Sequence, residues 1–151
     1  MLLERLRVLV AALWAGSLWT VGYLVAPTAF ASFERSMAGT VAASMFHSEA
    51  MLSIGCALAM LVLLWLAKEL DAKRRRRLTL VVLAMLAATL ISHYAVQPVM
   101  AGLRATAGPG GVMGPEAQSR FGMLHGVSSM IYLVQSLLAG YLVIKNSGRA
   151  A

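Results

Sequence analysis

The chain has 151 residues, of which 60% are apolar and only 13% are charged, and its formal net charge is +7. A soluble domain usually carries about a quarter charged residues, so this composition excludes an ordinary soluble enzyme. Five of the 13 cations form one run, residues 73–77, whereas a nucleic-acid-binding protein spreads its cations over a docking face. We therefore expect no nucleic-acid partner and interpret the basic run as a signal of membrane topology.

Four apolar stretches follow one another along the chain, each long enough to cross a bilayer, which requires about 20 helical residues. They cover residues 8–30, 46–67, 78–103 and 121–144. A basic loop at 68–77 follows the second stretch, and a Gly- and Pro-rich loop at 104–120 precedes the fourth. The pattern predicts one all-α domain over residues 1–151, an integral membrane four-helix bundle.

The first stretch has an alternative interpretation as a cleaved signal peptide. Ala29-Phe30-Ala31 has the small-x-small form of a cleavage site. A signal-peptide core has about 7–15 apolar residues, however, and this stretch is longer and contains two tryptophans. These features favour a retained helix.

The distribution of Lys and Arg predicts the orientation of the bundle. If both termini and the 68–77 loop are cytoplasmic, ten of these residues lie on that side and three on the other, namely Arg35, Arg104 and Arg120. We expect both termini in the cytoplasm. The partner that the sequence implies is the lipid bilayer, with the basic loop close to anionic headgroups.

Three histidines, His47, His93 and His125, lie within the spans. An imidazole in hydrocarbon needs a partner, a cavity or a cofactor. At about 1.5 Å of rise per helical residue, all three fall in the half of the bundle away from the 68–77 loop, on three different helices. We therefore consider a shared histidine site in that half.

Polar side chains recur at helical spacing around these histidines. On the second span His47 shares a face with Met51, one turn away. Two longer stripes are His125, Ser129, Tyr132 and Ser136 on the fourth span, and Thr89, His93, Val96 and Met100, flanked by Gln97, on the third. Because hydroxyls and imidazoles avoid lipid, we expect these stripes to face other helices or an internal cavity.

Imidazole binds copper, zinc and haem iron, and thioether binds Cu(I). The sequence therefore offers haem b held by His93 and His125, or copper held by the three histidines with Met51. The competing interpretation is that the histidines only join helices through hydrogen bonds, with a contribution of about 1 kcal/mol each. The residues alone leave these alternatives open.

Glu49 is the only acidic residue within a predicted span. An intramembrane acid is a candidate proton relay or cation ligand. Because Glu49 comes close to the mouth of its helix, pairing with Arg120 or His47 is the alternative.

Two small-x-x-x-small patterns, Ala12 with Gly16 and Gly122 with Gly126, indicate places where helices approach closely. We expect contacts within the bundle there. The alternative is contact between two copies of the chain in a homodimer.

Several runs of the sequence resemble a family of small four-helix membrane proteins: residues 13–19 (LWAGSLW), Pro27, Phe30, Phe46, Gln97-Pro98 and residues 121–129 (FGMLHGVSS). Its bacterial members carry a domain of unknown function, and its eukaryotic relative is the transmembrane protein associated with cisplatin resistance. The resemblance covers nearly the whole chain and implies four spans in a bacterial inner membrane. Its most specific part, the run at 121–129, singles out His125.

A looser likeness of architecture connects the chain to haem-binding protoporphyrinogen oxidases and copper-resistance D proteins, whose full motifs are absent. The best hypothesis from the sequence is a haem- or copper-binding membrane protein. The alternative is a cofactor-free small-solute transporter or a membrane scaffold for assembly. No nucleophile–base pair or phosphate-binding loop supports a hydrolase or a nucleotide-driven pump, and a redox enzyme is a third, weaker alternative.

Overall fold

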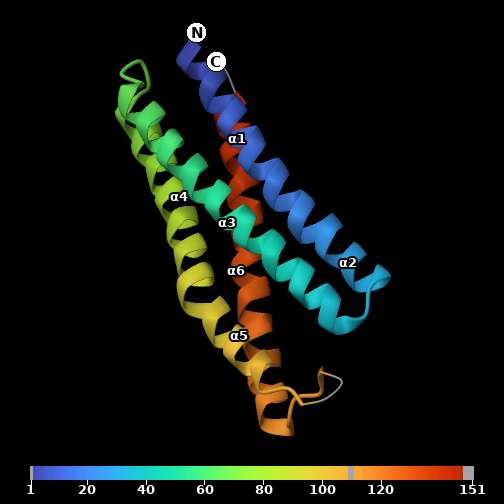
Figure 1. Ribbon diagram of the computed structural model, residues 1–151. Coiled ribbons are helices and arrows are strands. Elements are labelled where there is room, and N and C mark those ends of the chain that lie inside the picture. Colours follow the sequence, from blue (N-terminus) through green and yellow to red (C-terminus); the bar gives the residue numbers. More distant parts are fainter. Residues whose placement is uncertain (1, 109–110, 148–151) are drawn as a thin grey trace.

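The computed structural model describes residues 2–108 and 111–147, which form four long helical segments (Figure 1). All four are long and apolar enough to cross a membrane, and they cover Leu2–Ser32, Arg35–Leu66, Ala72–Ala105 and Pro115–Ser147. Three of them contain a predicted apolar stretch and extend beyond it at both ends, whereas the second begins earlier than predicted and ends at Leu66, one residue before the predicted end of the 46–67 stretch. The all-α, four-helix membrane fold predicted from the sequence is confirmed, and the protein is a multi-pass membrane protein.

The first and third segments are interrupted and the other two are continuous. The first consists of α1 (Leu2–Thr20), η1 (Val21–Val25) and α2 (Ala26–Ser32). The second is α3 (Arg35–Leu66), and the fourth is α6 (Pro115–Ser147). The third consists of α4 (Ala72–Ile91), η2 (Ser92–Val96) and α5 (Gln97–Ala105).

The interruptions η1 and η2 are single turns of π-helix, and each lies just before a proline, Pro27 or Pro98. Proline has no N–H group, and its ring clashes with the carbonyl four residues before it. The chain widens by one residue there, so that the N–H of Ala26 donates to the oxygen of Val21 and that of Gln97 to the oxygen of Ser92. Such π-turns displace the helix axis and re-aim the side chains that they carry.

The four segments occupy the corners of a bundle in which α1 packs against α3 and α6, and α4 also packs against α3 and α6. The N- and C-terminal ends lie together with the turn between α3 and α4 (Figure 1). We call this the basic end, because it carries residues 73–77. The opposite end, which carries Phe33 and Thr106, is called the distal end.

The half of the bundle at the basic end has a close-packed core. Its fully buried side chains come from all four segments: Trp14, Leu18, Met60, Leu64, Leu78, Val82, Met85 and Leu142. An ion pair of 2.9 Å between Arg7 and Glu69 joins α1 to the α3–α4 turn, and Arg74 donates to the backbone oxygen of Lys145 on α6. The hydrogen bond from Arg7 lowers the pKa of Glu69.

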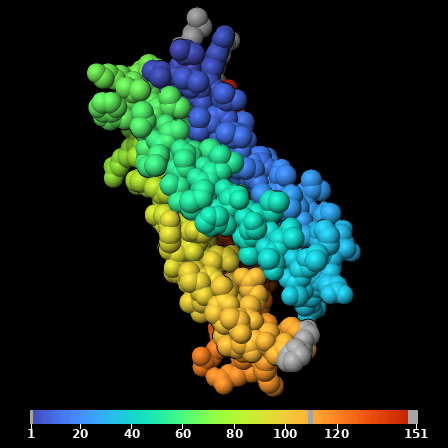
Figure 2. Space-filling model, in the orientation of Figure 1, coloured from blue at the N-terminus to red at the C-terminus, as the bar shows by residue number. Residues whose placement is uncertain are grey.

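The half at the distal end separates into two arms, α2 with α3 and α5 with α6 (Figure 1). On α6 no described residue before Gln135 is buried, whereas five residues from Gln135 to Asn146 are. In the space-filling view, a hollow lies between α3 and the α5 arm (Figure 2). The arms meet again through the Arg104 guanidinium, which donates to the oxygen of Gly39 at 3.2 Å.

The small-residue patterns do not pack within the bundle, contrary to the prediction. A Cβ atom added at Gly16, Gly122 or Gly126 would have nothing within 4 Å, and Ala12 is exposed. The reason on α6 is that no other helix covers this part of its surface. Close approach occurs instead at Gly22 in η1, where a Cβ would overlap the ring of Tyr132.

Candidate functional site

The candidate site lies where the two arms diverge, and we call this level the waist. It is formed by the two π-turns and by the residues that face them, which are Gly22, Tyr23, Phe46, His47, Glu49, His93 and Tyr132. At this level the two arms contact each other along two lines, which we call seams. Histidines hold the seam between α3 and η2, and tyrosines hold the seam between α6 and the first segment.

His47 and His93 meet across the seam between α3 and η2. Their ring centroids are 5.0 Å apart and their ring planes are inclined at 50°. His47 is exposed and His93 is half-buried, so the pair stands at the surface of the seam. The structure therefore brings together two of the three histidines that the sequence singled out.

The π-turn sets the direction of His93. Because η2 adds one residue to the turn, the side chains after it are rotated around the helix axis relative to their directions in a regular helix. Thr89, Val96 and Met100 of the predicted stripe are buried, and His93 lies at its margin, in a T-shaped contact with the Tyr94 ring with centroids 4.7 Å apart.

His125 does not join the other two histidines in a ring contact. Its ring stacks on Phe121 one turn before it on α6, with centroids 6.3 Å apart and an interplanar angle of 4°. His125 and Ser129 are exposed, which corrects the expectation that their whole stripe is covered by other helices. The stripe is covered only at Tyr132 and Ser136, because the arms diverge beyond the waist.

Tyr132 closes the seam between α6 and the first segment. Its hydroxyl donates to the oxygen of Leu18 at 2.6 Å, and its ring lies over Gly22. The Tyr132 ring also makes T-shaped contacts with the rings of Tyr23 and Phe46, with centroid separations of 6.2 and 5.4 Å. Only a glycine at position 22 leaves room for this ring, so the seam depends on η1 in the same way that the other seam depends on η2.

A buried hydrogen-bonded chain runs inward from the waist. The Trp14 indole N–H donates to the Ser53 hydroxyl at 2.7 Å, and that hydroxyl donates to the Glu49 carboxylate at 2.5 Å. All three side chains are buried. Arg120, the cation considered as a partner of Glu49, pairs instead with Glu116 at 2.9 Å.

Sequence reasoning missed a second buried polar contact below the waist. The Gln135 amide donates to the Thr89 hydroxyl at 2.7 Å, and that hydroxyl donates to the backbone oxygen of Met85. The available signal was an amide side chain in the middle of the fourth apolar span. The signal for the contact of Trp14 was Ser53, one helical turn after Glu49. Since the Ser53 hydroxyl donates to Glu49, it can accept a hydrogen bond from another helix.

The remaining predicted residues lie around the pair of histidines. Met51 is exposed one turn from His47 on α3, and Gln97 is half-buried at the start of α5. Within residues 2–108 and 111–147, no three His, Cys, Asp or Glu side chains are grouped so as to hold a metal ion. A metal at the waist would therefore have two imidazole ligands, which suits an ion that accepts low coordination.

Comparison with known proteins gives a family but no activity. A family described as a domain of unknown function, DUF4149, matches residues 9–109, about two thirds of the chain. The match runs from the middle of α1 past the end of α5 and includes both π-turns, His47, Glu49 and His93. No curated protein and no solved structure matches the chain.

Proposed function

We propose that this chain, which belongs to the DUF4149 family, is a membrane protein that binds a copper ion, as Cu(I), at the waist of its bundle through His47 and His93. The observation that carries the proposal is the contact of the two rings at 5.0 Å across the arms. Two imidazoles that share one ion, each with a metal–nitrogen distance of about 2 Å, have centroids about 5–6 Å apart.

The donor set distinguishes Cu(I) from the other candidates. Zinc takes four ligands or three and a water, and no described group of three His, Cys, Asp or Glu is present. Cu(I) is soft, accepts few ligands and binds thioethers, so Met51, one turn from His47, is a suitable third ligand. A haem iron between His47 and His93 would hold the ring centroids about 6 Å apart on opposite faces of a porphyrin, which is wider than the observed 5.0 Å.

Copper binding is tested by metal analysis and Cu(I) competition titration of the protein purified in mild detergent. We expect one Cu(I) per chain, and His47→Ala or His93→Ala to weaken binding by at least about tenfold. Met51→Leu should weaken it less. His125→Ala is the matched control, because His125 is an equally exposed intramembrane histidine without contact to the pair, and it should leave binding unchanged.

Two results would contradict the copper proposal. One is protein that binds no Cu(I) above the level of the His47→Ala/His93→Ala double variant. The other is a Soret band in protein from haem-supplied cells that is lost in His125→Ala, which would support haem held by His125 instead.

A cofactor-free transporter is the second candidate, and the observation that favours it is the buried chain from Glu49 through Ser53 to Trp14. A buried carboxyl group within a membrane-spanning segment is suited to take up a proton or a cation. This function predicts a proton flux in proteoliposomes that Glu49→Gln abolishes and His47→Ala leaves unchanged. Absence of flux above that of empty liposomes would exclude a proton path.

The membrane and the orientation belong to the same proposal. We place both termini in the cytoplasm of a bacterial cell, with the chain in the inner membrane, because ten Lys and Arg residues lie on that side and three on the other. The waist then faces the outer half of the bilayer. A reporter enzyme that is active only in the cytoplasm should therefore be active when it is fused after Ser147. The relation to the eukaryotic protein associated with cisplatin resistance rests on the runs quoted above.

A further inference from the structure

A pocket lined by positively charged side chains lies at the basic end, between α3 and α4. It has a volume of about 500 Å³. Three cations line it, Lys68, Arg75 and Arg76, together with the Thr79 hydroxyl and the apolar side chains of Leu61, Leu64, Trp65 and Leu80. No acidic residue lines it.

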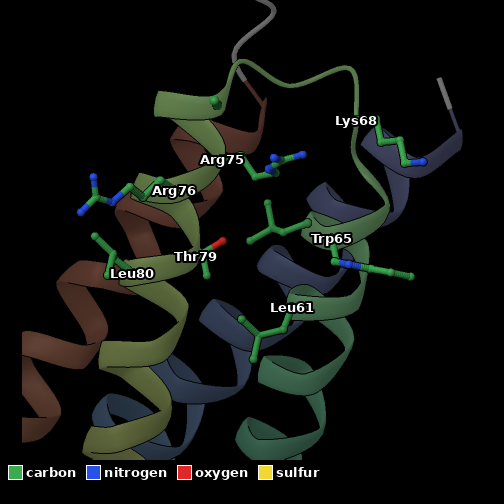
Figure 3. A pocket seen from close by; sticks show the side chains of 9 residues that line it. Leu61, Trp65, Lys68, Arg75, Arg76, Thr79 and Leu80 are labelled. Carbon is green, nitrogen blue, oxygen red and sulfur yellow. The ribbon is translucent and has the colours of Figure 1, made fainter.

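The three cations lie at the end of the pocket near the α3–α4 turn, and Leu61 and Leu80 lie toward the middle of the bundle. Figure 3 shows Arg75 and Thr79 directed into the gap between the helices, with Arg76 on the α4 rim and Lys68 on the α3 rim. In the part of the chain that the structure describes, these three cations make no ion pair. Three positive charges therefore stand around one pocket without a counter-charge from the protein.

The apolar wall extends from the pocket toward the middle of the bundle. Trp65 is 76% exposed and Leu80 is 56% exposed, so both lie on the surface that a bilayer covers. A tryptophan at the end of a spanning helix is typical of the headgroup level. A ligand here would have its anionic group among the cations and its apolar part along Leu61 and Leu80.

The neighbouring basic pocket on the other face of α4 differs in this respect. It contains Asp71, and its Arg74 already donates to the backbone oxygen of Lys145. Asp71 also accepts from the backbone N–H groups of Lys73 and Arg74, so the first turn of α4 is capped by the protein itself. An anion in the first pocket would therefore be held by side chains.

We infer that the pocket lined by Lys68, Arg75 and Arg76 is a binding site for an anionic glycerophospholipid, with the phosphate between the cations and one acyl chain along Trp65. Basic pockets between spanning helices on the side of the anionic leaflet suit such headgroups. The guanidinium groups donate to phosphate oxygens, and the Thr79 hydroxyl adds a further donor. This site is separate from the waist and independent of copper.

Quenching of Trp65 fluorescence by brominated lipids tests the inference in reconstituted protein. A Trp19→Phe background leaves Trp65 and the buried Trp14, and brominated phosphatidylglycerol is compared with brominated phosphatidylcholine as a minor component of phosphatidylcholine vesicles. We expect stronger quenching by the anionic lipid. Arg75→Gln and Arg76→Gln should each reduce its relative affinity by about fivefold.

Arg5→Gln is the matched control, because Arg5 is an exposed cation at the same end that lines neither pocket. It should leave the preference unchanged, and circular dichroism should show that all variants keep their helix content. Equal quenching by the two lipids, or an equal loss in Arg5→Gln and Arg76→Gln, would overturn the inference. Inorganic phosphate that removes the preference would assign the site to a free anion instead, and would also overturn it.

Discussion

The two halves of this bundle are made from the same four segments, yet only the half at the basic end is closed. There the large side chains of Trp14, Leu18 and Met60 are fully buried. In the distal half the buried residues are mostly small, such as Ala29, Ala38 and Ala42, and α6 has none before Gln135. The comparison teaches that one half holds the helices together, and the other presents polar side chains between two arms.

The boundary between the halves coincides with the π-turns. η1 and η2 lie at one level on two segments, and each brings a side chain to a seam, Gly22 under Tyr132 and His93 beside His47. If the helix were regular at either place, these side chains would be rotated around the helix axis by about one residue, or roughly 100°, and would not meet their partners. We conclude that the prolines after the π-turns serve to place the contacts of the waist.

The largest expected effect is a difference in lost stability between a substitution in the closed half and one in the distal half. Met60→Ala removes a side chain that is 0% exposed in the closed core and should lower the free energy of unfolding by about 2–5 kcal/mol. Met123→Ala, at a residue 66% exposed on the distal part of α6, should change it by less than about 0.5 kcal/mol. Reversible unfolding in mixed micelles measures both, and equal losses would contradict the division into halves.

The next effect concerns the tyrosine seam. Gly22→Ala places a methyl group inside the Tyr132 ring and should cost about 1–3 kcal/mol of stability, because the ring and η1 must move apart. The Gly22→Ala/Tyr132→Ala double variant should lose no more stability than Tyr132→Ala alone. Gly122→Ala, where a Cβ has free space, is the control and should be neutral or slightly stabilising. A Gly22→Ala protein as stable as the control would show that the seam is not close-packed.

A smaller effect is expected for the polar contact below the waist. Gln135→Leu and Thr89→Val each remove one partner of a buried hydrogen bond between α6 and α4. A double-mutant cycle in micelles should give a coupling energy of about 0.6 kcal/mol, the usual value for such bonds between membrane helices. A coupling near zero would mean that the two side chains are not bonded in the membrane.

The smallest effect is the pH dependence of the ion pair at the basic end. The hydrogen bond from Arg7 lowers the pKa of Glu69 from its usual value of 4.5, so folding favours the carboxylate form. The stabilisation is therefore present at neutral pH and is lost as the pH falls through the lowered pKa. The Tm difference between the natural protein and Glu69→Gln should be positive at pH 7, decrease as the pH falls below 4.5 and vanish once the pH lies below the lowered pKa. A difference independent of pH would exclude the ion pair as its cause.

The amino-acid sequence determined the fold more completely than the site. Four apolar stretches bounded by charge or by Gly and Pro sufficed for the bundle, because span length is set by bilayer thickness. Helix rotation is set by packing, and the sequence pattern did not reveal that His47 and His93 meet while His125 stacks on Phe121. The same limit applies to the glycines, since Gly22, which precedes Ala26 in a small-x-x-x-small pattern that was not singled out, packs closely, whereas Gly16, Gly122 and Gly126 do not.

A short repeated pattern in the sequence marks the two π-turns. Tyr-x-Val-x-Pro occurs twice, at residues 23–27 and 94–98, and each π-turn ends at the valine of this pattern. A proline within an apolar span indicates a disturbed turn before it, but it does not say whether the helix kinks or widens. Only the arrangement of neighbouring helices decides this.

The most direct test of the account is X-ray absorption spectroscopy of the protein loaded with one equivalent of Cu(I). We predict a first shell with two imidazole nitrogens, which is lost in the His47→Ala/His93→Ala double variant and kept in His125→Ala. A first shell without imidazole, or a spectrum that changes only in His125→Ala, would contradict the claim that the waist is the functional site.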